Sequence, residues 1–526
     1  MRFLHWMRLL PIVFGIRFPN MHVWLKKMFE FQRQHPVAAV SRALSLIRGN
    51  LITIIVFLVV GARSESFPFL WWIGGGFAFL LIVGVANWWR FLFKVENGEL
   101  HIKSGVFVRK NLYLSKDRVQ VIDITSGVLQ RMFGLVRVDI QTAGSTSREA
   151  AIDAITIQKA QEINRLLRAD EYADESEDQQ FKPEEKPHKE FKLPAKELLI
   201  AASTSGSFGI ALSILATVFS QIEPLISESE LFEYLFETLP SQTDFIFFLT
   251  VIVIFVVFAW LLSFFSTLFS YGNFNLTVKE NEMVITRGVF EKKRVTVPYN
   301  RIQAIHVAEG MIRQPLGYAS VHLESAGYGD EAGTGSIVLF PLVKKSEVLS
   351  LLDEVVPSYQ KEMSGLALPK RSLRRYLFRS TFLVTAATAV LYFWLELNNW
   401  IWIIPLLALF WGWLKYRAAA VAWAKGAFIF RSRTLSKSTA FINRNRVQNL
   451  TISQSPFQRW RKLCTAEIYV ASGDRGKSFS VRDIEAETGI WLLNEMQRRK
   501  GSETKSEPLE KDDRIIELPG WNQAAN

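Results

Sequence analysis

The sequence predicts an α+β membrane protein with six transmembrane helices in three hairpins, each hairpin followed by a small cytoplasmic β barrel or sandwich with a C-terminal helix. Three observations predict this class: a composition that mixes apolar and charged residues, six long apolar stretches, and a motif that occurs three times. The motif reads RVQVIDITSGVLQRMFGL from Arg118, RIQAIHVAEGMIRQPLGY from Arg301 and RVQNLTISQSPFQRWRKL from Arg446.

The composition of the 526-residue chain lies between that of a soluble protein and that of a membrane bundle. Hydrophobic residues make up 49%, including 40 Phe and 16 Trp, whereas charged residues still make up 21%. The single cysteine, Cys464, excludes an internal disulfide and a thiolate metal cluster, and it fits a reducing compartment. The net charge of +12 fits either nucleic acid or anionic lipid, and the apolar stretches favour lipid.

The apolar stretches are candidate membrane spans, because a helix needs about 20 apolar residues to cross the hydrocarbon core. The first and the fifth are short, and a buried core helix is their alternative, although flanking arginines can extend their head groups to the interface. None of the six contains an ionisable residue, which argues against a proton-coupled transporter, a voltage sensor or an intramembrane aspartyl protease. The stretches are 49–62, 66–89, 198–222, 245–270, 380–395 and 397–414.

The distribution of charge between the stretches predicts their orientation. The connector 223–244 within the second pair carries six acidic residues and no lysine or arginine, whereas basic residues crowd the opposite ends of the stretches. The positive-inside rule therefore places both termini and the three long polar segments in the cytoplasm, with only the connectors outside.

Each copy of the motif lies in a repeated unit of strands followed by one helix. Apolar residues alternate at Val136, Val138 and Ile140, as expected for a half-buried strand. Each unit closes with a helical pattern, at 157–167, 346–355 and 484–496. The order hairpin, β domain, linker is therefore expected three times.

The recurring Arg-Val/Ile-Gln is a candidate contact for an anion or a partner; its alternative role is to fix a turn that all copies share. The third copy also carries a basic segment with a tryptophan, which suits a lipid headgroup surface, with a solvated loop as the alternative. The candidate contact residues are Arg118, Gln120, Arg301, Gln303, Arg446 and Gln448, and the candidate lipid contacts are Arg459, Trp460, Arg461 and Lys462.

Hairpins followed by such domains resemble the bacterial pleckstrin-homology (PH) family, and their threefold arrangement resembles the YdbT-like membrane proteins, as does the segment from His35 to Ala38. The resemblance implies that each domain is a split β barrel with a C-terminal helix. It also implies a membrane-anchored module without known catalytic residues, linked to envelope stress or antimicrobial-peptide tolerance. A smaller YdbS-like membrane protein with one PH-like domain is the implied partner, in a homo- or hetero-oligomer.

The predicted function is a non-enzymatic plasma-membrane scaffold without cofactor, metal or nucleic acid, because the sequence has no phosphate-binding glycine loop, no metal-spaced cluster and no nucleophile beside a base. The alternative is a transporter or a membrane-associated enzyme that acts on lipid or peptide. The predicted segments are a basic amphipathic segment at 1–48, hairpins at 49–90, 197–271 and 376–421, PH-like domains at 91–168, 272–356 and 422–498, linkers at 169–196 and 357–375, and a disordered tail at 499–526.

Overall fold

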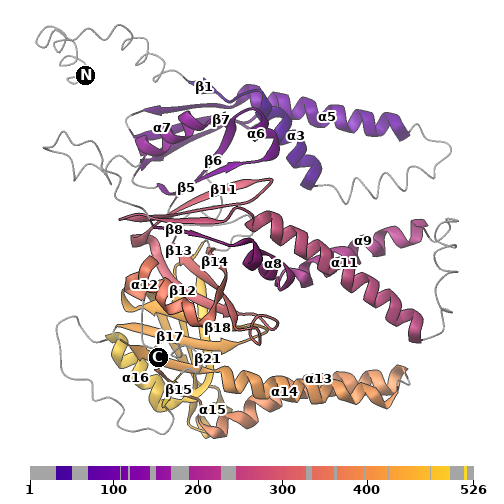
Figure 1. Cartoon of the computed structure of the whole chain (residues 1–526), viewed down its shortest axis with the longest axis vertical. Helices are drawn as coiled ribbons and strands as arrows, with labels where there is room; N and C mark the ends of the chain where they lie inside the picture. The colour runs from indigo at the N-terminus through magenta and orange to yellow at the C-terminus, as the bar shows by residue number, and fades with distance from the viewer. Residues whose placement is uncertain are drawn as a thin grey trace, which may run out of the picture. The chain divides into compact units, whose positions relative to one another are not determined.

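The computed structural model describes residues 31–49, 69–96, 98–106, 108–116, 119–142, 150–167, 189–226, 245–326, 335–359, 364–395, 398–424, 426–473, 476–497 and 515–517. The chain divides into two compact units. The first unit comprises residues 1–140 and 150–184, and the second comprises 141–149 and 185–526. Both combine long helices with antiparallel sheets, as Figure 1 shows.

The first unit contains a pair of helices and the first β domain. Its elements are β1 (Gln32–Arg33), α3 (Val37–Gly49), α5 (Phe69–Arg90), β2 (Leu92–Glu96), β3 (Glu99–Ser104), β4 (Lys110–Ser115), β5 (Val119–Ser126), α6 (Val128–Met132), β6 (Leu135–Thr142), β7 (Ala150–Thr156) and α7 (Ile157–Leu167). One sheet has the order β1-β2-β3-β4, and β7, β6 and β5 are neighbours in another.

The core of the first domain forms where these sheets and α7 meet. The strand alternation predicted at Val136, Val138 and Ile140 is confirmed, because all three side chains are buried. Ile163 and Leu167 of α7 pack into the same cluster, so the helix closes the open side of the sheets. This burial of apolar area is the main stabilising contribution to such a domain.

The second unit begins with the second helix pair and the second β domain. Its first elements are β8 (Lys189–Lys192), α8 (Ala195–Ser203), α9 (Phe208–Ile226), α11 (Phe245–Tyr271), β9 (Asn275–Val278), β10 (Glu282–Arg287), β11 (Lys292–Pro298), β12 (Ile302–Glu309), β13 (Tyr318–Ser325), β14 (Ser336–Lys344) and α12 (Val348–Val355). Strands β8, β9, β10 and β11 lie side by side in this order in one sheet. Strands β12, β13 and β14 lie side by side in another sheet.

The second unit ends with the third helix pair and the third β domain. Its remaining elements are β15 (Ser364–Ala367), α13 (Lys370–Leu395), α14 (Ile403–Ala418), β16 (Ala420–Ala424), β17 (Ala427–Arg433), β18 (Lys437–Asn443), β19 (Val447–Ser453), α15 (Pro456–Trp460), β20 (Leu463–Val470), β21 (Lys477–Glu485), α16 (Ala486–Gln497) and β22 (Ile515–Glu517). Strands β19, β20 and β21 form a separate sheet.

A short strand ahead of each helix pair joins the sheet that follows the pair. Strand β1 pairs with β2, β8 with β9, and β15 with β16, all antiparallel. The segments expected as linkers, 169–196 and 357–375, therefore contain strands, and β22 in the tail expected to be disordered pairs with β15. Strands of two to four residues are too short to show an alternation that sequence analysis can detect.

The helices depart in two ways from the six expected spans. Among the described residues, two helical segments, 249–271 and 370–395, are long and apolar enough to cross a membrane, or up to three if the bent pair of α8 and α9 is one span. Six spans are therefore not supported, and most of the expected stretch 49–62 lies outside the described residues. The expected span 198–222 is broken, with a 51° bend between α8 and α9, where Ser205, Gly206 and Ser207 interrupt the helix.

Antiparallel pairing of β12 with β18 joins the second and third domains into one eight-stranded sheet. Beside this join, His306 stacks on His322 with ring centroids 4.9 Å apart, and Nδ1 of His306 lies 3.2 Å from Oε1 of Glu324. Ser472 donates a hydrogen bond to the same carboxylate. Burial lowers the pKa of His322 well below its usual range, and the nearby charge of His306 adds to this shift.

Candidate functional site at the helix–domain junctions

One position of the repeated motif lies where each domain meets its own helix pair. Gln130, Arg313 and Gln458 stand at the same distance after the recurring arginine of their copies, within or beside the short segment that follows β5, β12 or β19. Each makes polar contacts that differ from copy to copy. We call these three regions the helix–domain junctions.

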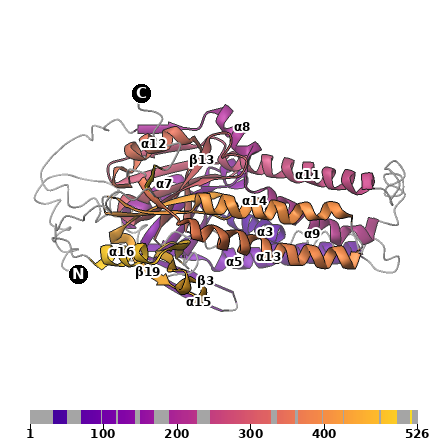
Figure 2. The same ribbon diagram turned by 90° about the horizontal axis from the view of Figure 1, so that it is seen from below.

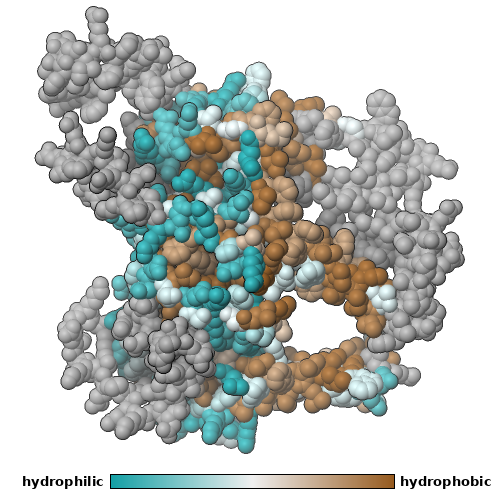
Figure 3. All heavy atoms as spheres, viewed as in Figure 1, coloured by the Kyte–Doolittle hydropathy of each residue, from teal (hydrophilic) through white to brown (hydrophobic). Residues whose placement is uncertain are grey.

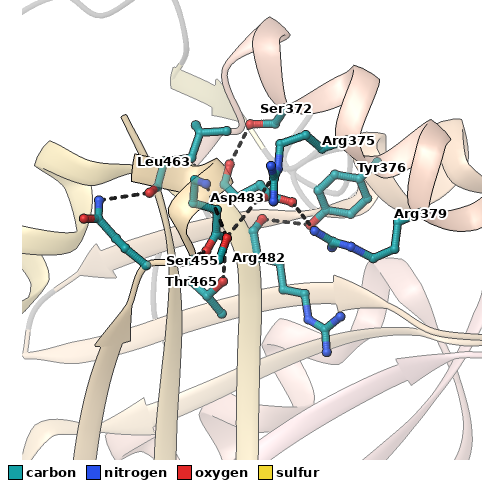
Figure 4. Close-up of polar contacts among 11 residues, drawn as sticks. Ser372, Arg375, Tyr376, Arg379, Ser455, Leu463, Thr465, Arg482 and Asp483 are labelled. Carbon is teal, nitrogen blue, oxygen red and sulfur yellow. Dashed lines mark hydrogen bonds and ion pairs between the residues drawn. The ribbon is translucent and has the colours of Figure 1, made fainter. Parts of the chain in front are cut away.

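The third junction is centred on Asp483, whose carboxylate is fully buried. Nε of Arg375 lies 2.8 Å from Oδ1, and Nη2 of Arg379 lies 2.8 Å from Oδ2. Nε2 of Gln458 donates to Oδ1 at 2.9 Å. Figure 4 shows both arginines reaching from α13 toward this carboxylate at the end of β21. These charge-assisted hydrogen bonds compensate the cost of burying the carboxylate.

Backbone contacts complete the third junction. The hydroxyl of Ser372 donates to the carbonyl oxygen of Asp483 at 2.6 Å, and the hydroxyl of Tyr376 donates to that of Arg482 at 2.9 Å. Asp483 has φ of 58°, a left-handed conformation that Asp and Asn tolerate better than most residues. The first two turns of α13 are thereby fixed to the end of β21.

Local sequence also positions Gln458. Ser455 caps α15 by accepting a hydrogen bond from the backbone N–H of Gln458, whose side chain accepts one in return from the N–H of Ser455. Nε2 of Gln458 then donates hydrogen bonds to the hydroxyl of Thr465, at 2.9 Å, and to the carboxylate of Asp483. The capping box thus holds the amide in the orientation that the junction needs.

The first junction, within the first unit, uses the same chemistry with different partners. Nε of Arg42 on α3 lies 2.8 Å from Oδ2 of Asp153 on β7. Nε2 of Gln130 donates to the hydroxyl of Ser41 at 2.9 Å. Arg137 lies 3.4 Å from the other oxygen of Asp153. A helix arginine and a strand carboxylate therefore connect helix to domain in the first and third copies.

The second junction has the cation in the loop instead of on the helix. The guanidinium of Arg313 donates to the carbonyl oxygens of Pro341 and Ala201 and to the hydroxyl of Thr204, each at 3.0 Å. Burial lowers the pKa of Arg313, but an arginine side chain remains protonated in proteins. Three acceptors without a formal charge replace the carboxylate.

Exposed apolar side chains surround the residues that make these contacts. Trp460 is 82% exposed and Met132 is 75% exposed, which is unusual for such large apolar groups. We call this set the apolar tips: Val128, Met132 and Phe133 in the first copy, Met311, Ile312 and Leu316 in the second, and Phe457 and Trp460 in the third.

A second turn in each domain is also apolar and exposed, at Val108, Phe290 and Leu435. In the second domain the ring of Phe290 lies 4.6 Å from that of Phe269 at the end of α11, centroid to centroid. This turn therefore lies at the level where the candidate membrane helix enters the domain. Figure 3 shows hydrophobic surface over α11, α13 and α14 and hydrophilic surface over the sheets of the same unit.

The structure describes four of the six recurring Arg and Gln side chains. Arg118 and the side chain of Gln120 lie outside the described residues. Gln303 is buried, and its amide donates to the carbonyl oxygen of Arg301 at 3.1 Å, whereas Gln448 is exposed. Arg301 and Arg446 are both half-buried. Their role as anion or partner contacts stays a prediction.

The predicted lipid contacts of the third copy lie together on the surface. Arg459, Trp460, Arg461 and Lys462 are all exposed on and just after α15. The guanidinium of Arg461 lies 5.9 Å from the ring centroid of Trp460, within cation–π range. A basic and aromatic surface of this kind is typical of a membrane–water interface.

Sequence analysis missed the ion pairs between helix and strand at the junctions, above all those of Asp483 with Arg375 and Arg379. A signal was present, because Gln130 and Gln458 occupy one position of the repeat and Arg313 replaces them in the second copy. Among the described residues, no group of three or more His, Cys, Asp or Glu side chains is arranged to hold a metal ion. The contacts at the junctions join helix residues to domain residues.

The fold and the junctions define a membrane protein built from repeated helix-anchored PH-type domains. The family model for the bacterial PH domain matches residues 37–171, 234–357 and 375–500, and the chain belongs to this family. The transmembrane protein YdbT of Bacillus subtilis (strain 168) is 32% identical over 487 residues, which cover 89% of this chain and 98% of that protein. The chain is thus a YdbT-like bacterial PH domain protein.

Proposed function

We propose that this protein is a non-enzymatic scaffold of the bacterial plasma membrane, whose three PH-like domains are held against the cytoplasmic face. In this proposal the helix pairs anchor each domain and the apolar tips enter the interface of the inner leaflet. The scaffold then presents the remaining domain surfaces to a partner protein. A smaller YdbS-like membrane protein and a role in envelope stress or antimicrobial-peptide tolerance are parts of the same proposal.

The observation that carries the proposal is the position of the apolar tips. They occur on the same short segment of all three domains, directly beside the residues that bind the helices. Large apolar side chains that stay exposed in three equivalent places favour an apolar environment outside the protein. Burial of one such side chain in lipid contributes about 1.5–3 kcal/mol.

The charges at the helix ends support the cytoplasmic orientation. The domain-proximal ends of α13 and α14 carry Arg371, Arg374, Arg375, Lys415 and Arg417. Basic residues beside a span favour the cytoplasmic side. Within the second unit, α11, α13 and α14 leave the sheets on the same side (Figures 1 and 2). One membrane can therefore accept both helix pairs of this unit.

Six spans in three hairpins remain part of the proposal. Helix α14 has 16 residues, close to the minimum that spans a bilayer, and Trp400 and Trp402 at its start are suited to the interface. The acidic connector 223–244 then lies outside the cell, where it attracts cationic peptides. Neutralising Glu228, Glu230, Glu233 and Glu237 lowers tolerance to a cationic peptide if this is correct, and unchanged tolerance removes that part of the proposal.

The central experiment measures how deeply a tip enters the membrane. Trp460→Cys and, as a matched control, Ile490→Cys are labelled with an environment-sensitive fluorophore in proteoliposomes that contain spin-labelled lipid. Ile490 is also apolar and exposed, but it lies on α16 and does not belong to the apolar tips. The native Cys464 is buried, so it does not compete for the label.

The expected result is strong quenching at position 460 and little at position 490. Equal quenching at the two positions would show that the tip does not enter the bilayer.

Purification from mild detergent tests the scaffold role separately, because a small membrane protein that co-purifies in stoichiometric amount supports it. Turnover of a lipid or a peptide by the purified chain would favour the enzymatic alternative.

A further inference from the structure

The second and third domains are joined by a strand pairing, and equivalent strands exist in the other copies of the repeat. Strand β18 is the last strand before the recurring arginine of its copy, and it pairs with β12, the strand that directly follows the recurring arginine of the preceding copy. In the observed register Ile305 is opposite Phe441, and Ala308 is opposite Ser438. The equivalent strands of the other copies lie at similar distances along the sequence from their own recurring arginines.

Ion pairs of Glu309 also stabilise the join between β12 and β18. Nζ of Lys437 on β18 lies 2.9 Å from Oε1 of Glu309 on β12, and Lys345 lies 3.6 Å from the other oxygen of that carboxylate. Glu309 and Lys437 are both buried at the join. The join is therefore a paired sheet with an enclosed ion pair, and it is continuous with the core of the unit.

Two strands of the same kinds lie at the ends of their sheets. Strand β19 is the third-copy equivalent of β12, and it is the outer strand of the sheet β19-β20-β21. Strand β4 is the first-copy equivalent of β18, and it is the outer strand of the sheet β1-β2-β3-β4. Within the described residues, each has a neighbouring strand on one side only.

The burial of the two equivalent strands differs accordingly. Seven of the eight residues of β12 are buried, whereas none of the residues of β19 is. Leu450 and Ile452 of β19 are half-buried, but Ile305 and Val307, their equivalents in β12, are fully buried. An outer strand exposes a row of backbone N–H and C=O groups that another strand can pair with. The edge of β19 thus lacks the neighbour that β12 has.

We propose that β19 of one copy of this chain pairs with β4 of a second copy, in the register that joins β12 to β18. Among the described residues, one outer strand of each complementary kind is present, so a second copy can supply the strand that pairs with each. The observed join sets Leu450 opposite Tyr113 and Ser453 opposite Lys110. Such a contact is head-to-tail, and it therefore builds rings or open arrays.

The membrane is compatible with this association. The join of β12 with β18 leaves α11 and α13 on the same side of the second unit (Figure 1). A contact that repeats this join places the first helix pair of the next copy on the same side as α13 and α14. The ion pair is absent from the new contact, because Gln454 and Arg109 stand where Glu309 and Lys437 stand in the join. The association between copies is therefore weaker than the join and reversible.

Disulfide trapping in membranes tests this register. One tagged copy carries Lys110→Cys and a differently tagged copy carries Ser453→Cys, so a disulfide between the two tags forms only between chains. The expected product is a mixed dimer at least about tenfold more abundant than the dimer of Asn111→Cys with Ser453→Cys, because adjacent residues of a strand point to opposite faces. Chains with the native Cys464 alone give the background.

The pair Ala308→Cys and Ser438→Cys within one chain is the positive control, because these residues are opposite each other in the join. If this control closes and the mixed dimer does not exceed the Asn111→Cys pair, the association is refuted. A disulfide from Ser453→Cys to a smaller protein instead of the second copy refutes it also. That outcome leaves the proposed scaffold function intact, whereas failure of the quenching experiment leaves this association intact.

Discussion

Replacing Asp483 with Asn tests how firmly the third helix pair is attached to its domain. The substitution removes the negative charge that faces Arg375 and Arg379, but it keeps a short polar side chain that tolerates the φ of 58° at this position. Breaking a buried ion pair costs about 3–5 kcal/mol when both partners are enclosed. Because both arginines are partly exposed, we expect a smaller loss of about 2–3 kcal/mol of unfolding free energy.

Cys464 supplies the assay, because it is the only cysteine and lies in the core of the third domain. Burial raises the pKa of this thiol to about 11, so the folded domain reacts slowly with a thiol reagent near neutral pH. When labelling follows opening of the domain, a loss of 2–3 kcal/mol raises the rate about 30- to 150-fold. Labelling of the denatured chains gives the intrinsic rate for each variant.

Two companion variants make the result specific. Glu487→Gln removes an exposed carboxylate from the first turn of α16 and is expected to change the labelling rate less than about fivefold. Asp483→Ala adds the strain of a left-handed alanine, about 1 kcal/mol, and is expected to label faster than Asp483→Asn. A rate for Asp483→Asn within about threefold of the native rate would refute the attachment role of this cluster.

Three further predictions concern the second domain and its join to the third. Arg313→Met leaves three acceptors without their donor and is expected to accelerate proteolysis of the second domain at least about tenfold, whereas native-like resistance contradicts its junction role. The lowered pKa of His322 means that below about pH 6.5 the unfolded chain binds a proton that the folded chain does not, so stability falls with falling pH. Thermal unfolding between pH 7 and pH 5 measures this fall in stability, and a His322→Gln variant with the same pH slope would contradict it. Glu309→Gln leaves Lys437 without its charged partner and is expected to speed hydrogen exchange in β18 more than Lys437→Met does; the reverse order would show that the ion pair does not hold the join.

The repeat and the strand patterns could be predicted from the sequence because they are local. The helix predicted at 157–167 matches α7, and the alternation around Val138 matches a buried strand. The junctions could not be predicted in the same way, because Arg375 and Asp483 are 108 positions apart and meet only in the folded domain. The pairing of β12 with β18 could not be predicted for the same reason, since no local pattern specifies which sheet edges meet.

In the second junction the cation is in the loop and its acceptors carry no formal charge, and this difference from the other junctions follows from the break between α8 and α9. Helix α13 continues without interruption past its junction, so its carbonyl groups are used within the helix and the contact needs a cation on the helix and a carboxylate on the strand. Helix α8 ends at Ser203, and its last carbonyl groups lack partners within the helix. The guanidinium of Arg313 donates to the carbonyl of Ala201 at this end, where the helix dipole also favours a positive charge.

The helix break and the arginine in the loop are therefore one coupled change. An unbroken α8–α9 helix would leave the guanidinium of Arg313 without one of its acceptors, and a glutamine in place of Arg313 would leave the carbonyl at the end of α8 without a donor. A glutamine suffices at Gln130 and Gln458 because α3 and α13 carry the cation themselves. The repeat thus preserves the attachment of each domain to its helices while the residues that make the attachment change.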